Sequence, residues 1–246
     1  MKNNMIYGIH PVEEAIKTGK SIDKIFIQKG LKGKGSNELM HLLQEKGINY
    51  KSVPIEKLNR LTRENHQGVV AFISPVSFEN LEDILEKTNF EKPVSFLLLD
   101  GITDTRNFGA IIRTAVAADV QAIIIPENNS APVNDEVVKT SAGGIFKIPI
   151  AKVKHLKDAI FLLQSYDINI FSATEKTNNS IYDADFKQHT GIIMGNEGKG
   201  VQKSLLNISE KIKIPMSDKI DSLNVSVACG IILFEMNRQR ARFARS

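Results

Sequence analysis

The sequence predicts an α/β protein, a parallel sheet with helices on both faces, preceded by a smaller α/β domain. After Pro93, six apolar runs of strand length follow one another, and helical patterns separate most of them. The runs are continuously apolar, which is typical of strands that are buried on both faces. We expect these strands at residues 95–100, 122–127, 147–153, 168–174, 191–196 and 211–216. Helical patterns cover 109–120, 134–144, 156–166 and 200–207, and a long helix is expected from about Ser222 to Arg242.

The first 75 residues alternate helix and strand patterns and predict a small domain of their own. Helices are expected over 11–19 and 36–47, and strands over 23–30, 48–54 and 68–75. Ser36 is a plausible N-cap of the second helix and Gly47 its stop, while the polar stretch 63–68 is expected to be a loop. Residues 76–92 are acidic with one helix-like patch, and we interpret them as a linker. The predicted domains are therefore 1–75 and 93–246.

Composition narrows the class of protein. Of the 246 residues, 42% are hydrophobic, which is enough for a packed core. No apolar run approaches the roughly 20 residues that span a bilayer, and the start of the sequence has no signal-peptide core. The single cysteine, Cys229, excludes an intrachain disulfide and favours a reducing cytoplasm. The net charge of +4 leans mildly toward an anionic partner, and no metal-ligand spacing is present.

Three polar, glycine-containing segments follow predicted strands. They are "DGITDTRNFGA" (100–110), "GNEGKG" (195–200) and "IPMSDKIDSLNVS" (214–226). Ligands of parallel α/β sheets bind at the carboxyl ends of strands, so three such segments predict one shared site. The glycines of "GNEGKG" fit neither the dinucleotide fingerprint nor a P-loop, so the two common phosphate cradles are poor fits.

Three longer stretches contain these segments and carry a family resemblance. "LDGITDTRNFGAIIRTA", "IIMGNEGKGV" and "IPMSDKIDSLNVSVACGIILFEMNRQR" resemble, in order and spacing, the three motifs of the SpoU (TrmH) branch of the SPOUT RNA methyltransferases. "YGIHPVEEAI" and "HQGVVA" resemble the RNA-substrate-binding domain of that family, which is L30e-like. The resemblance covers nearly the whole chain, and within the family it is strongest to the 23S rRNA guanosine-2′-O-methyltransferase group.

The resemblance implies a fold and a reaction. Members tie the C-terminal part of the α/β domain into a deep trefoil knot, hold S-adenosylmethionine in the knotted loops and form homodimers. Matching the motifs assigns the methyl-donor contacts to Gly195, Ile214 and Leu223. The implied reaction transfers a methyl group to a ribose 2′-oxygen of RNA and needs no metal.

The motifs also imply catalytic residues, namely Asn107, Arg113, Glu197, Asn224 and Ser226. Family proposals treat the arginine at the position of Arg113 as the general base. A guanidinium is protonated at all ordinary pH values, so the base role stays open. Arg113 is instead suited to stabilising a developing alkoxide or fixing a phosphate. The alternative is that Arg113 is a surface arginine. Its apolar neighbours in the sequence argue against this alternative.

Each of the other candidates has a plainer structural alternative. Asn107 is placed to cap a helix or to hydrogen-bond within the catalytic loop, and both roles can coexist. Glu197 orients the arginine or the ribose, or it merely begins a helix. In "SLNVS", Ser222 is a possible N-cap and Asn224 an ordinary first-turn residue, whereas the motif makes Asn224 and Ser226 active-site groups.

Residues outside the motifs receive less specific predictions. Cys229 is expected in the core, and His10 and His66 are expected to be structural or to face RNA. Thr105 stands where family members often have proline. The basic tail and Arg106 are expected to contact phosphates, although arginines at a helix end also suit the helix dipole. The arginines of the tail are Arg238, Arg240, Arg242 and Arg245.

We therefore expect a homodimeric RNA 2′-O-ribose methyltransferase in which 1–75 recognises RNA and 93–246 binds the donor and catalyses. A guanosine of 23S rRNA is the favoured target, and a tRNA ribose is the alternative. Two rivals stay open, a non-catalytic RNA-binding protein on the same fold and an NAD-dependent oxidoreductase. The missing glycine fingerprint argues against the second rival.

Overall fold

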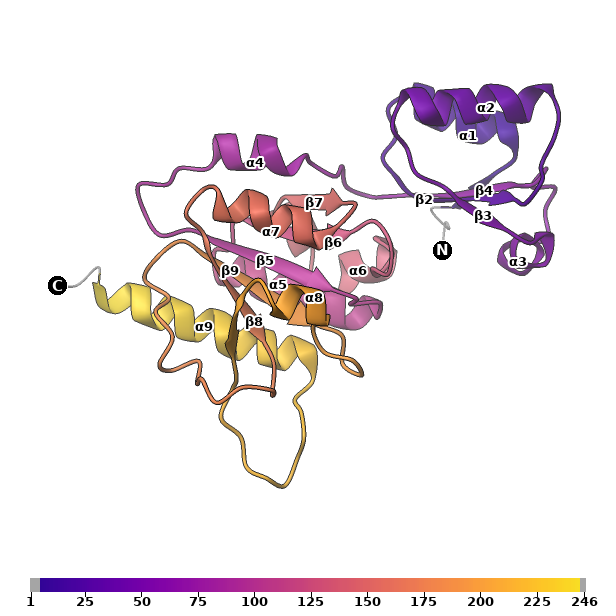
Figure 1. Ribbon diagram of the computed structural model, residues 1–246. Helices are drawn as coiled ribbons and strands as arrows, with labels where there is room; N and C mark the ends of the chain where they lie inside the picture. The colour runs from indigo at the N-terminus through magenta and orange to yellow at the C-terminus, as the bar shows by residue number, and fades with distance from the viewer. Residues whose placement is uncertain (1–4, 244–246) are drawn as a thin grey trace. The chain divides into compact units, whose positions relative to one another are not determined.

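The computed structural model describes residues 5–243. The chain divides into two compact units (Figure 1), one formed by residues 1–77 with 132–135 and the other by 78–131 with 136–246. Within residues 5–243, no helix combines the length and the apolar character needed to span a membrane.

The first unit is a four-stranded sheet with the strand order β1-β4-β2-β3. Its strands are β1 (Met5–Tyr7), β2 (Ile22–Gln28), β3 (Lys51–Val53) and β4 (Val69–Ile73), and its helices are α1 (Ile9–Lys17), α2 (Lys34–Glu45) and α3 (Ile55–Leu61). Alternate residues of β2 are buried, as a strand with two unlike faces requires. Val12 of α1 and Leu39 of α2 pack on one face of the sheet, and Leu58 of α3 packs with Val70 in a separate cluster.

Most predicted elements of the first unit are confirmed, with one wrong cap and two missed elements. Helix α2 begins at Lys34 after Gly33, and Ser36 lies inside its first turn, where its Oγ donates to the Gly33 carbonyl at 2.8 Å. Gly47 follows the end of this helix with a φ of 62°, a conformation that suits a residue without a side chain. The sequence did not predict β1 and α3, because elements of three and seven residues show too little periodicity.

The second unit is a six-stranded sheet with the order β10-β8-β9-β5-β6-β7, and all its pairings are parallel. All six predicted strands are confirmed. They are β5 (Ser95–Asp100), β6 (Ala122–Pro126), β7 (Ile150–Val153), β8 (Asn169–Ala173), β9 (Thr190–Gly195) and β10 (Glu210–Ile212). Every residue of β5 is buried, which agrees with its continuously apolar sequence. The trefoil knot that the family resemblance implies stays a prediction.

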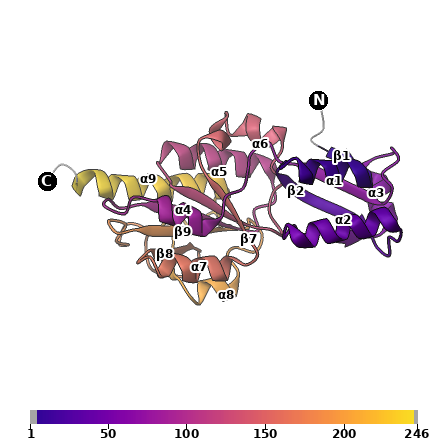
Figure 2. The same ribbon diagram turned by 90° about the horizontal axis from the view of Figure 1, so that it is seen from above.

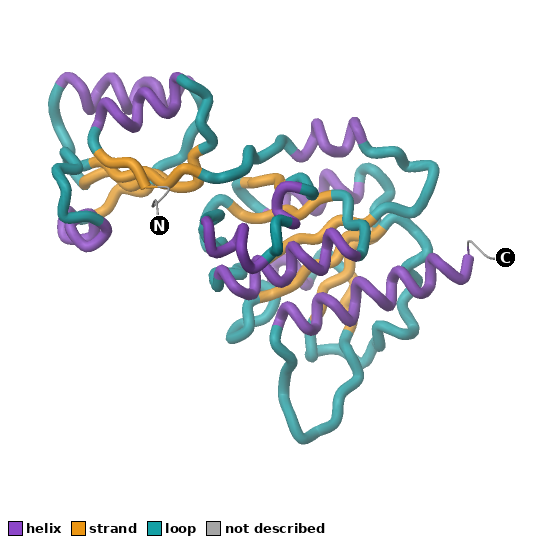
Figure 3. Tube along the Cα trace, turned by 180° about the vertical axis from the view of Figure 1, so that it is seen from behind, coloured by secondary structure: helices purple, strands orange, loops and turns teal. Residues whose placement is uncertain are grey.

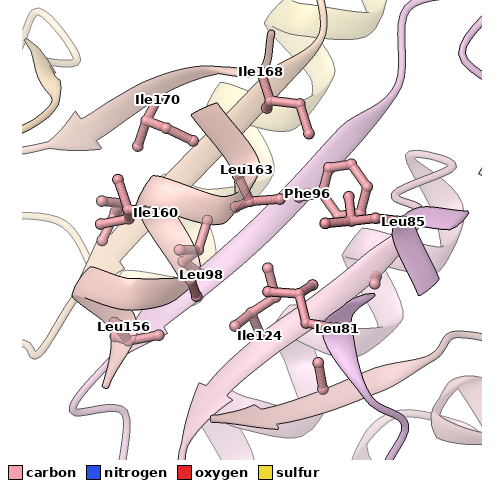
Figure 4. Packing of buried hydrophobic residues seen from close by; sticks show 14 of the residues in the cluster. Leu81, Leu85, Phe96, Leu98, Ile124, Leu156, Ile160, Leu163, Ile168 and Ile170 are labelled. Atoms are coloured by element: carbon pink, nitrogen blue, oxygen red, sulfur yellow. The ribbon is translucent and has the colours of Figure 1, made fainter. Parts of the chain in front are cut away.

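Helices cover both faces of this sheet (Figure 2). They are α4 (Leu81–Lys87), α5 (Thr105–Ala117), α6 (Asp135–Thr140), α7 (Leu156–Gln164), α8 (Lys203–Leu206) and α9 (Val225–Phe243), with the 3₁₀ turn η1 (Gly144–Phe146). Apolar side chains of α4 and α7 pack on one face against Phe96, Leu98 and Ile124 (Figure 4). Leu205 of α8 belongs to the same core cluster. Helices α5 and α9 pack against each other on the other face (Figure 3).

The segment 76–92, expected to be a linker, contains α4. Asn80 caps this helix by accepting a hydrogen bond from the backbone N–H of Glu82 at 2.8 Å. Leu81, Ile84 and Leu85 are buried in the core of the large sheet. The helix-like patch therefore packs as part of the second unit.

Two arginines of the basic tail are bound within the chain. Arg240 donates to the carbonyls of Phe186, Val94 and Gln188 at 2.9, 3.1 and 3.0 Å. Burial lowers the pKa of Arg240 to about 10, so it stays cationic at neutral pH. Arg238 forms an ion pair with Glu235 at 2.7 Å. The expected phosphate contacts are therefore wrong for Arg240, whose donors are used inside the fold. The side chain of Arg242 and all of Arg245 lie outside the described residues.

The stability of the second unit is expected to fall in mild acid because of His189. Partial burial, reinforced by the nearby charge of Arg240, lowers the pKa of His189, although Asp167 acts in the opposite direction. The unfolded chain, in which this pKa is about 6.5, then binds the proton more readily than the folded chain. The contribution is complete above that pH and declines as the pH falls toward the folded pKa.

The free energy of unfolding, measured by urea titration between pH 7.5 and 5, tests this expectation. His189→Gln is expected to make the decline shallower, since glutamine does not titrate. An unchanged slope in that variant would assign the pH dependence to other groups.

Candidate active site

Three loops meet at the carboxyl edge of the large sheet. They follow β5 (residues 101–104), β9 (196–202) and β10 (213–224). The first two are tied together by Asn196, whose Nδ2 donates to the Gly101 carbonyl at 2.9 Å. Gln202 adds two bonds to the buried Asp100 carboxylate, from its backbone N–H at 2.7 Å and from its Nε2 at 2.5 Å. The predicted convergence of these loops is confirmed.

The loops bring together three of the predicted catalytic side chains. The Glu197 carboxylate accepts from Asn107 Nδ2 at 3.0 Å and from Asn224 Nδ2 at 2.7 Å. Asn224 Nδ2 also donates to Asn107 Oδ1 at 2.9 Å. Each residue comes from a different motif, and the sequence separations reach 117 positions. We call Asn107, Glu197 and Asn224 the amide–carboxylate cluster.

The structure excludes the plainer alternatives for two members of the cluster. The N-cap of α5 is Asp104, which accepts from the backbone N–H of Asn107 at 2.8 Å, so Asn107 is not the cap. Glu197 lies six residues before the start of α8 at Lys203 and does not begin a helix. The side chains of Asn107 and Glu197 therefore serve the hydrogen bonds of the cluster and do not cap or begin a helix.

Asn224 combines the two roles considered for its motif. Helix α9 begins at Val225, so Asn224 occupies the capping position and Ser222 does not. Asn224 Oδ1 accepts from the Ser226 backbone N–H at 2.9 Å and from Ser226 Oγ at 2.6 Å. Ser226 thus reaches the cluster through Asn224. One amide side chain caps α9 with its oxygen and binds Glu197 with its nitrogen.

Two substitutions separate these roles of Asn224. Asn224→Ala is expected to cost about 1 kcal/mol of stability by removing the cap and to remove the bond to Glu197. Asn224→Ser keeps a good capping group but cannot reach Glu197, so stability is expected to stay near that of the parent while methyl transfer falls as in the alanine variant. Thermal melts with initial rates test this. Full activity in the serine variant would reduce Asn224 to a cap.

Arg113 lies apart from the cluster. It follows Asn107 by six residues on α5, which places it roughly 240° around the helix. Its Cα is 3.6 Å from a Cβ built on Gly144, so it borders η1. The Arg113 side chain is exposed, although its apolar sequence neighbours argued against a surface arginine. Among residues 5–241, Arg113 has no hydrogen-bond or ion-pair partner.

A cavity in the second unit opens beside the cluster. It measures about 720 Å³ and is lined by the loops after β9 and β10, with Glu197 among its walls. Gly195, Ile214 and Leu223, the three residues predicted to contact the methyl donor, all line it. A Cβ on Gly195 would lie 2.2 Å from the carbonyl carbon of Gly200 and 2.2 Å from the Val201 nitrogen. Only glycine allows the loop to fold back this closely.

Several other predicted residues have structural roles. Cys229 is fully buried, as predicted, and burial raises the pKa of its thiol to about 12. His66 is buried and bonded to Asn59 at 2.8 Å, whereas His10 is exposed beside Glu13. Arg106 pairs with Glu136 at 3.4 Å. Thr105 also bonds to the Glu136 carboxylate, which a proline could not do. No cluster of three potential metal ligands occurs among the described residues.

Four residues that shape the loops have no role predicted from the sequence. Asp104, Asn196 and the Asp100–Gln202 pair carry no chemistry-specific signature. Asp104, three residues before Asn107, has the spacing of an N-cap and was detectable on that ground. The Asp100–Gln202 contact joins residues 102 positions apart and has no local sequence signal.

Comparison with known proteins identifies the class. Residues 95–234 match the model of the SpoU rRNA methylase family. Residues 5–79 match a model described as RNA 2′-O ribose methyltransferase substrate binding. Relatives named as TrmH family tRNA/rRNA methyltransferases occur in Staphylococcus epidermidis and Staphylococcus aureus. Each is 35% identical over 246 residues, covering 98% of this chain and 97–98% of the relative.

Solved structures share the fold. The SpoU methyltransferase AviRb from Streptomyces viridochromogenes, in complex with AdoMet, aligns with a TM-score of 0.63 at 23% identity, covering 97% of this chain and 90% of that one. An AdoMet-bound rRNA methyltransferase from Sinorhizobium meliloti aligns with a TM-score of 0.61 at 26% identity, covering 95% and 86%. The class is thus an RNA methyltransferase. The chain belongs to the SpoU family, also called TrmH.

Proposed function

We propose that this protein transfers a methyl group from S-adenosylmethionine to a ribose 2′-hydroxyl of structured RNA. The observation that carries the proposal is the placement of Gly195, Ile214 and Leu223 around one cavity that Glu197 also lines. Two structural relatives were solved with AdoMet bound, which supports the choice of donor. The family model matched by residues 5–79 supports RNA ribose as the acceptor.

The cavity suits the donor in size and lining. Its volume of about 720 Å³ falls within the roughly 300–1,000 Å³ of small-molecule sites. Apolar walls such as Ile214, Leu223 and Ile232 alternate with loop backbone. These groups would hold the donor by packing and main-chain hydrogen bonds, which explains why the chain needs no dinucleotide fingerprint.

The protein's own chemistry in this reaction is positioning and electrostatics. The bound donor supplies a methyl group on a sulfonium. The ribose 2′-oxygen takes up this methyl group, the hydroxyl proton passes to water, and the sulfur becomes a thioether. Holding two reactants in line supplies about 7–11 kcal/mol of the barrier. The amide–carboxylate cluster orients the ribose through Glu197, and the fixed positive charge of Arg113 stabilises the developing alkoxide.

A homodimer forms part of the proposal. The exposed side chains Val227 and Phe234, with exposed fractions of 51% and 53%, lie on one side of α9, where they are spaced by two helical turns. Exposed apolar surface of this kind marks protein–protein contacts. Arg113 and the cluster are separate within one chain, and a second copy placed against α5 and α9 would supply the missing half of each site. Sedimentation at micromolar concentration tests this, and a monomer that methylates RNA would contradict it.

We propose a guanosine of 23S rRNA as the target, on the strength of the sequence resemblance. A tRNA ribose is the second candidate, because an Aquifex aeolicus TrmH/SpoU tRNA modifying enzyme aligns at 31% identity over 67% of this chain and 82% of its own, with a TM-score of 0.57. Cytoplasmic RNA would be the substrate in either case, in line with the single cysteine.

The decisive experiment supplies the protein with methyl-labelled donor and with total RNA from a strain that lacks the gene. Label in a single ribose, located by alkaline-resistance mapping, is expected in rRNA. Label in a base would overturn the reaction, and label in tRNA would overturn the favoured target. Calorimetry with S-adenosylmethionine and with NAD addresses the oxidoreductase alternative. RNA binding without transfer would favour the non-catalytic alternative.

A further inference from the structure

A second cavity of about 440 Å³ lies at the same edge of the large sheet. Its walls come from the end of β5, the loop after β6, the start of α7 and the segment around α8; they include Asp100, Asn128, Asn129, Lys154, Lys157 and Ser204. None of the predicted catalytic or donor-binding residues lines it. The usual ligand sites of such folds are crevices at the carboxyl edge, beside the topological switch point. In this sheet β5 lies at that point, because the connections after it and after β9 run to opposite sides.

The two cavities are neighbours. A Cβ built on Gly101 would lie 3.0 Å from Asn129 Nδ2, which lines the second cavity, and 3.6 Å from Asn196 Cβ, which lines the first. The turn at Gly101 is therefore the thin wall between them. A ligand that occupies the first cavity's mouth and continues past this wall must be an extended chain.

The lining of the second cavity suits an anion. Lys154 and Lys157 are exposed, and neither has an ion-pair partner among residues 5–241. Helix α7 begins between them with no side chain capping its first turn, so its positive end is available. Asp158 also lines the cavity and offsets one charge. The buried Asp100 also lines the cavity, and both of its carboxylate oxygens accept hydrogen bonds from Gln202.

An aromatic ring beside Lys157 points to a nucleic acid. Phe161 is 49% exposed on α7, one turn after Lys157, whose Nζ lies 5.6 Å from the ring centroid. Exposed aromatic rings next to cations are stacking platforms for unpaired bases. A free phosphate or metabolite has no need of this ring, whereas an RNA strand uses the ring and the cations together.

We propose that the second cavity and Phe161 bind a nucleotide that flanks the modified one, with its phosphate on Lys154 and Lys157 and its base stacked on Phe161. The Asn128 and Asn129 amides then face polar groups of the bound strand. The inference rests on RNA being the substrate of the proposed function, and it assigns to the catalytic unit its own share of RNA binding.

The test measures RNA affinity of the full chain with a fragment of its substrate. Lys154→Ala/Lys157→Ala is expected to weaken RNA binding on the order of tenfold at moderate salt and to reduce the log–log salt slope by about 1.4–1.8. Phe161→Ala is expected to weaken RNA binding without changing the salt slope. Phe161→Tyr is expected to keep the RNA affinity of the parent, because tyrosine retains a stacking ring. Donor affinity is expected to be unchanged in all variants, because the first cavity is intact.

The matched control is Lys87→Ala/Lys92→Ala, which removes two exposed lysines near the opposite edge of the same sheet. Equal RNA affinities of the two double variants would overturn the proposal. Saturation of the site by inorganic phosphate or a mononucleotide at micromolar concentration, with no effect of Phe161→Ala on RNA, would overturn the assignment to RNA. Binding is read separately from methyl transfer, so a failure of the proposed reaction leaves this result interpretable.

Discussion

Gly195→Ala is expected to weaken the binding of S-adenosylmethionine roughly ten- to hundredfold. The added methyl group would lie 2.2 Å from two backbone atoms of Gly200 and Val201, and neither can move aside as a side-chain end would. Relieving such an overlap costs about 1–3 kcal/mol, which is one to two powers of ten in Kd. The loop that must move carries Glu197, so methyl transfer should fall further than donor affinity. Calorimetry with the donor and single-turnover rates measure both effects.

Gly198→Ala is the matched control from the same loop. The nearest atom to its Cβ, Asn196 Oδ1, would lie 3.5 Å away, and its φ is in the ordinary range. We expect donor affinity within about threefold of the parent, since surface substitutions seldom exceed 0.5 kcal/mol. If both variants bind the donor equally well, the close approach at Gly195 does not shape the donor site.

Arg113→Ala is expected to lower kcat for methyl transfer by about 10²–10³ while the Kd for the donor stays the same. A positioned cation at a developing alkoxide contributes on this scale. Arg113 is exposed and has no partner among residues 5–241, so its removal should leave the melting temperature unchanged. Arg113→Lys should restore little, because an ammonium lacks the planar pair of donors.

Arg106→Ala provides the comparison within the same helix. Arg106 is engaged by Glu136 in an exposed ion pair, and exposed pairs contribute about 0–1 kcal/mol. We expect kcat to stay within a factor of three. Activity of Arg113→Ala at the level of Arg106→Ala would remove Arg113 from the reaction and favour a non-catalytic role.

The sequence was sufficient for the large sheet because each of its strands is an apolar run that helical patterns separate. It was also sufficient to bring Asn107, Glu197 and Asn224 into one hypothesis, because they lie in three motifs of one family. The capping residues were misassigned because each helix start offers two good caps within one turn. These are Asp104 and Asn107 for α5, and Ser222 and Asn224 for α9. Only the chain's three-dimensional path distinguishes them.

Other features depended on contacts between distant segments. The exposure of Arg113 and the capture of Arg240 by three carbonyls have no local signature. The sequence around an arginine near a helix end does not show whether its side chain is solvent-exposed or bonded to other parts of the chain. The packing of α4 was missed for a related reason, since its acidic outer face dominates the composition of 76–92 while its buried residues number only three.

The hydrogen bonds from Arg240 to the carbonyls of Val94, Phe186 and Gln188 also affect folding during synthesis of the chain. Val94 precedes the central strand β5, whereas Arg240 is translated after every strand of both sheets. The first unit can fold while the rest of the chain is still on the ribosome. The second unit must wait for α9 to emerge before its central strand is secured at its start. Nascent chains stalled just before α9 should therefore present a protease-resistant first unit, residues 1–77, followed by a protease-sensitive remainder.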